Sequence, residues 1–114
     1  MIRERSELRV LLVEDSRADA HIDRLMLDGV ESPPGRLDHV STIAEARKAL
    51  REAQYDCILL DLTLPDADRL EGLEQVRVLA PAVPVVVLTG HDDEQLALQA
   101  LHEGAQDYLI KGKV

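Results

Sequence analysis

Five side chains that could do chemistry each stand at the end of a short apolar stretch of the chain: Glu14, Asp15, Asp61, Thr89 and Lys111. Three carboxylates that converge repel one another, and a hard divalent cation such as Mg²⁺ relieves that repulsion. A lysine ammonium and a threonine hydroxyl suit the oxygens of a phosphoryl group. A carboxylate nucleophile, a metal, a cation and a hydroxyl donor are the parts needed to move a phosphoryl group onto an aspartate. These residue types therefore predict an aspartyl phosphate site, provided that the fold brings them together.

The apolar stretches before these side chains have the pattern of buried strands. Residues 57–60 and 85–88 are apolar at every position, as in strands covered on both faces of a parallel sheet. Helical patterns alternate with them, one of which opens on a capping box at Thr42 and Glu45. We predict five strands, at 9–13, 37–41, 57–60, 85–88 and 107–110. We predict four helices between them, at 16–29, 42–53, 70–80 and 92–103.

This alternation predicts an α/β domain with a parallel sheet and helices on both faces. In such a sheet the ligand crevice lies outside the carboxyl ends of the strands, where the strand order reverses. With the order 2-1-3-4-5 the reversal falls between the first and third strands, so Asp15 is expected to lie beside Asp61. A helix cap or a turn is the purely structural alternative for Asp61, and the side chains at the other strand ends argue against it.

The composition predicts one domain over residues 1–114, with a loose tail at 1–8. The sequence has no signal peptide and no apolar run of the roughly 18 residues that a membrane span needs, so we expect a soluble, cytoplasmic protein. The single cysteine, Cys57, lies in an apolar stretch and is interpreted as a core residue. The net charge of −9 argues against binding to nucleic acid or to an anionic membrane. The histidines show no metal-ligand spacing and are interpreted as surface or helix residues: His21, His39, His91 and His102.

Four motifs resemble the receiver domain of two-component response regulators: VLLVEDS at 10–16, LLDLTLP at 59–65, VVVLTG at 85–90 and YLIKG at 108–112. Each motif alone is weak, but their order and separations make the set specific over residues 9–112. The resemblance implies a flavodoxin-like open parallel sheet of five strands in the order 2-1-3-4-5. It also implies a signalling domain that takes a phosphoryl group from a phosphohistidine on a sensor histidine kinase or a histidine phosphotransfer protein.

The resemblance implies roles for the acidic residues. Asp61 would be the phosphoacceptor. Asp15 and Asp61 would ligate Mg²⁺ directly, together with the backbone carbonyl of Thr63, while Glu14 would act mainly through water. Mn²⁺ could substitute for Mg²⁺. Such a domain catalyses only its own phosphorylation and dephosphorylation, so we do not expect an enzyme that acts on other substrates.

The remaining site residues also take their expected roles from the resemblance. Lys111 would contact the phosphoryl oxygens, and Thr89 would be a switch hydroxyl that moves towards the phosphate. Tyr108 would turn inward when Thr89 moves, although a plain edge aromatic is the alternative for this residue. Thr63 and His91 would tune the lifetime of the phosphorylated state. The sequence identifies neither the cognate kinase nor the output domain or target.

Three features depart from the family pattern. Gly112 stands where proline commonly follows the lysine, and Arg69 stands where glycine is common in the family. The chain stops at Val114, where the family normally adds a fifth helix. We therefore expect either a piece of a longer protein or a partner, such as a second copy in a homodimer, that covers the sheet face left by that helix.

Two other functions are open on the sequence. A Mg²⁺-dependent phosphohydrolase of the haloacid dehalogenase type uses a similar aspartate nucleophile, with a second aspartate two residues later as acid and base. Thr63 occupies that position here, so the general acid is lacking. The other possibility is a degenerate receiver that acts as an interaction module without phosphorylation, which intact Asp15, Asp61, Thr89 and Lys111 disfavour.

Overall fold

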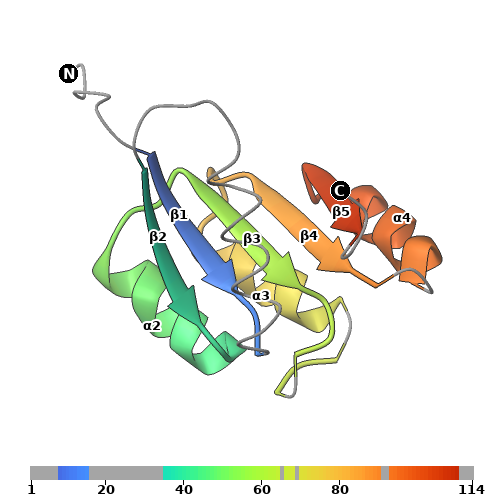
Figure 1. Cartoon of the computed structure of the whole chain (residues 1–114), viewed down its shortest axis with the longest axis horizontal. Coiled ribbons are helices and arrows are strands. Elements are labelled where there is room, and N and C mark those ends of the chain that lie inside the picture. Colours follow the sequence, from blue (N-terminus) through green and yellow to red (C-terminus); the bar gives the residue numbers. More distant parts are fainter. Residues whose placement is uncertain (1–7, 16–34, 65, 69, 91–92, 111–114) are drawn as a thin grey trace.

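A computed structural model describes residues 8–15, 35–64, 66–68, 70–90 and 93–110 of the chain. In this part of the chain five parallel strands form one sheet in the order β2-β1-β3-β4-β5 (Figure 1). The strands are β1 (Leu8–Val13), β2 (Gly35–Val40), β3 (Cys57–Asp61), β4 (Val85–Thr89) and β5 (Asp107–Ile110). The predicted strand order and the flavodoxin-like fold are confirmed. β1 begins at the last residue of the predicted tail.

Helices cover one face of this sheet (Figure 1). They are α2 (Ile43–Glu52), α3 (Glu71–Leu79) and α4 (Glu94–His102). Their ends lie within two residues of the predicted ones, and the helix predicted at 16–29 falls outside the described residues. No helix in the described ranges is long and apolar enough to cross a membrane.

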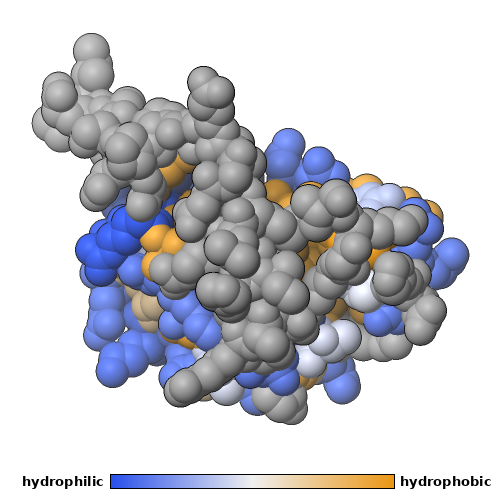
Figure 2. Space-filling view, in the orientation of Figure 1, coloured by the Kyte–Doolittle hydropathy of each residue, from blue (hydrophilic) through white to orange (hydrophobic). Residues whose placement is uncertain are grey.

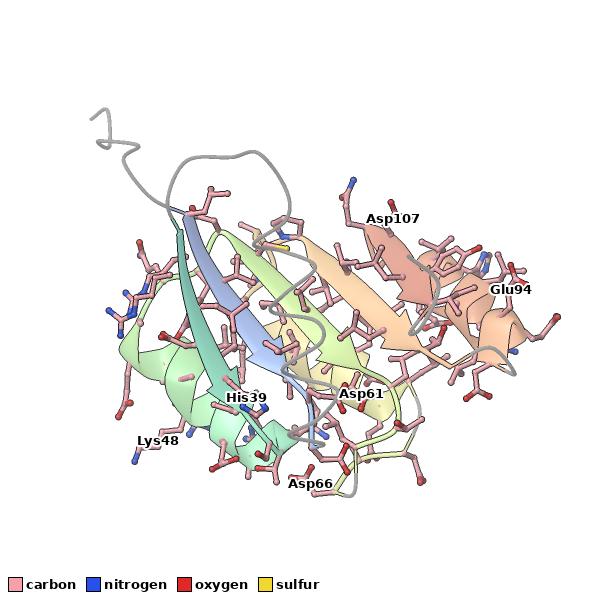
Figure 3. All side chains as sticks on the ribbon, viewed as in Figure 1. His39, Lys48, Asp61, Asp66, Glu94 and Asp107 are labelled. Atoms are coloured by element: carbon pink, nitrogen blue, oxygen red, sulfur yellow. The ribbon has the colours of Figure 1, made fainter. Side chains whose placement is uncertain are left out.

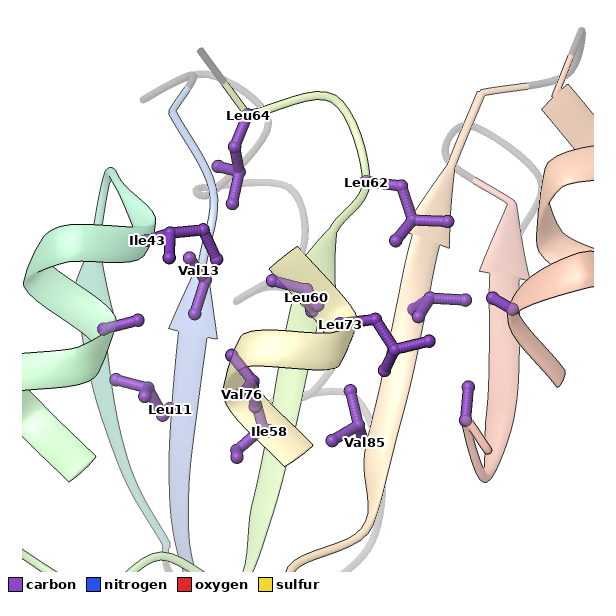
Figure 4. Packing of buried hydrophobic residues seen from close by; sticks show 14 of the residues in the cluster. Leu11, Val13, Ile43, Ile58, Leu60, Leu62, Leu64, Leu73, Val76 and Val85 are labelled. Atoms are coloured by element: carbon purple, nitrogen blue, oxygen red, sulfur yellow. The ribbon is translucent and has the colours of Figure 1, made fainter. Parts of the chain in front are cut away.

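The main core fills the space between the sheet and these three helices (Figure 4). Each inner strand contributes alternate residues to it, because successive side chains of a strand point to opposite faces. The strand residues in this core are Leu11, Val13, Ile58, Leu60, Val85 and Val87. Residues next to these in the strands, Leu12, Leu59 and Leu88, are buried on the opposite face, where they form a second cluster. Burial on both faces is the reason why these strands read as unbroken apolar runs.

The second face of the sheet is the one seen in Figure 2, where hydrophobic residues show among hydrophilic ones. Cys57 lies half-buried on this face and packs against the second cluster. Burial raises the pKa of the Cys57 thiol, so the thiol stays protonated at neutral pH. A protonated, packed thiol agrees with the interpretation of Cys57 as a core residue.

The start of α2 confirms the predicted capping box. The hydroxyl of Thr42 accepts a hydrogen bond from the backbone N–H of Glu45 at 3.1 Å. In return, the Glu45 carboxylate accepts from the backbone N–H of Ser41 at 2.8 Å. The return bond therefore reaches one residue further back than the usual capping box, which ends on the N-cap residue itself. α2 begins where its polar side chains satisfy amides that have no partner inside the helix.

Gly104 ends α4 in a backbone conformation that only glycine adopts easily, with φ +113°. A Cβ at this position would also overlap the guanidinium group of Arg77, whose Nη1 donates to the Glu103 carbonyl at 2.8 Å. We therefore expect Gly104→Ala to lower the free energy of unfolding by about 1–3 kcal/mol, measured by urea denaturation. Gly90→Ala is the matched control, because Gly90 has no positive φ and a Cβ added there would meet no atom within 4 Å. Equal losses in the two variants would contradict this reading of Gly104.

A polar network ties the amino-terminal half of the sheet to the segment after α2. Tyr55 donates from its hydroxyl to Asp38 at 2.7 Å, and Arg36 donates from Nε to the same carboxylate at 3.0 Å. The Arg9 guanidinium lies 5.2 Å from the centre of the Tyr55 ring and 3.6 Å from Asp38. The Tyr55 hydrogen bond, helped by Arg36, lowers the pKa of Asp38 below its ordinary value of 3.8.

This shift predicts how the stability contributed by Asp38 depends on pH. A carboxyl group with a lowered pKa stabilises the fold above its unfolded pKa, and the contribution is lost as the pH falls through the folded pKa. We expect Asp38→Asn to reduce the free energy of unfolding by about 1 kcal/mol at pH 7. The difference from wild type should shrink as the pH drops below about 4, in urea titrations across the acid range. A gap that stays constant down to pH 2 would show that the charge of Asp38 does not matter; Tyr55→Phe, which keeps the ring, should reproduce part of the loss.

Candidate functional site

The three predicted acids converge at the carboxyl edge of the sheet, where Figure 3 labels Asp61 at the end of β3. Carboxylate oxygens of Glu14, Asp15 and Asp61 all lie within 4.8 Å of one another. The register explains the convergence, since Val13 pairs with Leu60 and the next residue of each strand is an acid. Glu14 and Asp61 are buried, with exposures of 0% and 1%, whereas Asp15 is exposed. The predicted neighbourhood of Asp15 and Asp61 is thus present.

Thr63 holds the carboxylate of Asp61 from the loop that follows β3. Its backbone N–H donates to Oδ1 of Asp61 at 2.9 Å, and its hydroxyl donates to the same oxygen at 2.7 Å. Both bonds restrict the rotation of the carboxyl group. The Thr63 side chain therefore acts directly on the residue expected to react.

His39 also contacts the site, which the sequence interpretation missed. Its Nε2 lies 2.7 Å from the backbone carbonyl of Glu14, and a carbonyl can only accept, so Nε2 carries the proton. The backbone N–H of Glu14 donates to the Val40 carbonyl at 3.0 Å. β2 thus holds the acidic turn from the side, and His39 is a half-buried strand residue, not a helix residue. The sequence feature that could have predicted this contact is the position of His39 near the carboxyl end of β2, the strand that pairs with β1. Figure 3 labels His39 at that position.

Thr89 lies at the carboxyl end of β4 with an exposure of 0%. Among the described residues, its Oγ1 has no hydrogen-bond partner. A buried hydroxyl without a partner costs free energy, so it is suited to accept or donate a bond when another group arrives. The neighbouring register pairs Thr89 with Ile110, which brings β5 alongside.

Tyr108 lies half-buried on β5 and is turned towards α4. Its hydroxyl donates to Oε2 of Glu94, in the first turn of α4, at 3.2 Å. The hydrogen bond to Glu94 raises the pKa of Tyr108, with the negative charge of the same carboxylate adding to the effect. Lys111 and His91, which complete the predicted set, lie outside the described residues, as do Arg69 and Gly112.

The donor set fits a hard divalent cation. Mg²⁺ and Mn²⁺ prefer carboxylate and carbonyl oxygens, and three carboxylates within 4.8 Å supply such ligands at one point. Two of the three are buried, so their mutual repulsion is only weakly screened by water. A cation at this point would offset that repulsion, which is the physical reason to regard the cluster as a metal site.

Comparison with known proteins points to one family. The family model of the response regulator receiver domain matches residues 10–113. The swarming motility regulation protein RssB of Serratia marcescens is 35% identical over 104 residues, which cover 91% of this chain and 46% of that protein. The transcriptional regulatory protein QseB of Haemophilus influenzae is 37% identical over 108 residues, covering 91% of this chain and 46% of that protein. The chain spans about half the length of these curated relatives.

Solved structures agree with the sequence comparison. A putative response regulator from Chloroflexus aurantiacus superposes with a TM-score of 0.80 at 25% identity, over 92% of this chain and 85% of that one. The Mn²⁺-bound form of response regulator Rcp1 superposes with a TM-score of 0.78 at 28% identity, over 94% of this chain and 83% of that one. Fold and sequence therefore lead to the same family.

Proposed function

The chain belongs to the response regulator receiver domain family, and on that premise we propose that Asp61 is its phosphoacceptor. The observation that carries the proposal is the burial of Asp61 at the end of β3, within 4.8 Å of two further acids. Receiver domains accept a phosphoryl group from histidine kinases, so the donor here would be a phosphohistidine. An oxygen of Asp61 forms the new bond to phosphorus while the bond to the donor imidazole nitrogen breaks.

Asp15, Asp61 and the Thr63 backbone carbonyl are proposed to hold Mg²⁺, with Glu14 acting through water. Mn²⁺ would serve as well, and the form of Rcp1 similar to this chain contains it. The bound cation would neutralise the acids and the incoming phosphoryl oxygens. Asp15 is the exposed member of the acidic group, so it faces the side from which a cation and a phosphoryl donor arrive.

We propose that Thr89 and Tyr108 change conformation in response to the phosphoryl group. Lys111 would hold its oxygens by charge, and Thr89 offers a buried hydroxyl on the neighbouring strand. If Tyr108 turns inward, it has to leave its 3.2 Å hydrogen bond with Glu94. The switch then consists of two states of Tyr108 whose populations the phosphoryl group changes. Thr63 and His91 are proposed to set the lifetime of the aspartyl phosphate, and the hydroxyl of Thr63 on Asp61 supports its part.

We assign no turnover of other substrates to this domain. A phosphohydrolase of the haloacid dehalogenase type needs an acid two residues after the nucleophile, and Thr63 stands there and donates to Asp61. The test is phosphoryl uptake from acetyl phosphate with Mg²⁺, compared between the wild-type chain and Asp61→Asn. Uptake in the wild type alone supports an active receiver, whereas the absence of uptake in both chains would support the degenerate interaction module.

A further inference from the structure

The loop after β3 is fastened to the first turn of α2 by one side chain, Asp66. Oδ1 of Asp66 accepts from the backbone N–H of Ile43 at 2.9 Å, and Oδ2 accepts from the N–H of Ala44 at 3.1 Å. Ile43 and Ala44 are the first two residues of α2, whose amides have no partner within the helix. A carboxylate is favourable there because it also meets the positive end of the helix dipole. Figure 3 shows Asp66 at the same edge of the sheet as Asp61.

The cap provided by Asp66 is additional to the local cap of α2. Thr42 already satisfies the N–H of Glu45, the third residue of the helix. Asp66 satisfies the two amides that Thr42 leaves, from 23 positions away in the chain. One helix end is therefore capped by two residues, of which only Asp66 belongs to the loop that carries the site.

Residues on both sides of Asp66 in the chain also pack near Ile43, at the start of α2. Leu64 is 6% exposed and lies in the main core with Ile43 and Val13 (Figure 4). At the start of α3, Gly72 comes so close to Ile43 that a Cβ would lie 3.0 Å from its Cδ1. Ile43, the first residue of α2, therefore packs against residues that precede and follow Asp66. The loop is held against this end of the helix on both sides of Asp66.

Few polar contacts fix the loop elsewhere. The backbone N–H of Leu62 donates to the Leu88 carbonyl at 3.2 Å, which holds the start of the loop on β4. Beyond Leu62, the described loop residues form hydrogen bonds to elements other than the adjoining β3 and α3 only through the two bonds of Asp66. Thr63 lies between these two anchors and is itself exposed.

We propose that Asp66 is a positioning residue for the cation site: it holds the loop on α2 and so fixes the Thr63 backbone carbonyl relative to Asp61. The inference rests on the proposed function, in which that carbonyl is a ligand. Mg²⁺ demands near-octahedral geometry with short ligand distances, so a carbonyl on a loose loop must first be ordered, and the ordering weakens binding. With Asp66 in place, the loop is ordered before the cation arrives.

The experiment compares Mg²⁺ affinity, by calorimetric titration, in four variants of the chain. Asp66→Ala is expected to weaken Mg²⁺ binding about three- to tenfold, which is part of the ordering cost of one residue, since Leu62 and Leu64 still hold the loop. Asp66→Asn, which keeps one acceptor oxygen, should fall between Asp66→Ala and wild type. Thr42→Ala removes the local cap from the same helix end, and Asp68→Ala removes an exposed acid from the same loop. Both controls should bind Mg²⁺ within about twofold of wild type.

Two further readouts separate positioning from general destabilisation. Hydrogen exchange of the Ile43 and Ala44 amides in metal-free protein should accelerate in Asp66→Ala and stay near the wild-type rate in Thr42→Ala. At saturating Mg²⁺, phosphoryl uptake from acetyl phosphate by Asp66→Ala should return to the wild-type rate, because only the affinity for the cation is affected.

The outcomes distinguish this inference from the proposed function. Wild-type Mg²⁺ affinity in Asp66→Ala, or an equal loss in Thr42→Ala, overturns the positioning role while leaving the phosphoacceptor assignment in place. A wild-type chain that neither binds Mg²⁺ nor takes up a phosphoryl group overturns the proposed function, and the positioning role with it.

Discussion

Asp61→Asn is expected to abolish phosphoryl uptake while leaving the fold intact. The amide has almost the shape of the carboxylate, and its oxygen can still accept the bonds from the backbone and hydroxyl of Thr63. It is, however, a far weaker nucleophile, and it carries no charge to attract a cation. We expect the rate of labelling from acetyl phosphate with Mg²⁺ to fall by more than about 1000-fold, measured by intact-mass spectrometry of the chain.

A matched control for this variant is Asp68→Asn. Asp68 is an exposed acid on the same loop, so its replacement changes the net charge by the same amount without touching the site. It should be labelled at the wild-type rate. Mg²⁺-dependent labelling that persists in Asp61→Asn would place the phosphoryl group on another residue and would end the assignment of Asp61. Circular dichroism of both variants checks that each has kept its fold.

The second large effect is expected for Asp15→Asn, which should weaken Mg²⁺ binding by about tenfold or more. Loss of a group that only supports a metal ligand already costs that much, and Asp15 is proposed to ligate directly. Asp15 is the exposed acid of the group, so the variant removes a charge from the mouth of the site without opening the core. Calorimetric titration with MgCl₂, repeated with MnCl₂, measures the loss.

The control for Asp15 is an acid of equal charge at the other end of the sheet. Asp107 is exposed at the start of β5, far along the strand direction from the site in Figure 3. Asp107→Asn should leave Mg²⁺ affinity nearly unchanged, because screening by water and salt weakens the influence of a distant surface charge. Similar losses in the two variants would mean that overall charge, and not a ligand at residue 15, governs binding. Phosphoryl uptake by Asp15→Asn at high Mg²⁺ then separates a loss of affinity from a loss of chemistry.

Strands and helices could be predicted here because burial leaves a local trace. β3 and β4 are packed on both faces, so their sequences are continuous apolar runs. The start of α2 is recognisable from the capping residues Thr42 and Glu45. Given the strand order, the neighbourhood of Asp15 and Asp61 followed from the chain alone. Each of these features depends on periodicity or on residues that stand next to one another.

Contacts between segments distant in the sequence could not be predicted in the same way. The bond from His39 to the Glu14 carbonyl depends on the rotamer of one side chain at the end of β2. Asp66 reaches α2 only because the loop after β3 bends back over Ile43, and Arg77 meets Gly104 only because α3 lies beside the end of α4. No periodic pattern of hydrophobic residues predicts these contacts, because they depend on how the helices and loops pack on the sheet.

The amino-acid sequence thus determined which groups can perform the chemistry and at which edge of the sheet they meet. It could do so because buried strands and their ends are recognisable from short segments of sequence. Tertiary packing alone decided which distant residues hold the site in place: His39 on the carbonyl of Glu14 and Asp66 on α2. The physical reason is that a hydrogen bond needs its atoms placed to within a few tenths of an ångström. Only the folded chain sets distances of that kind between residues far apart in sequence.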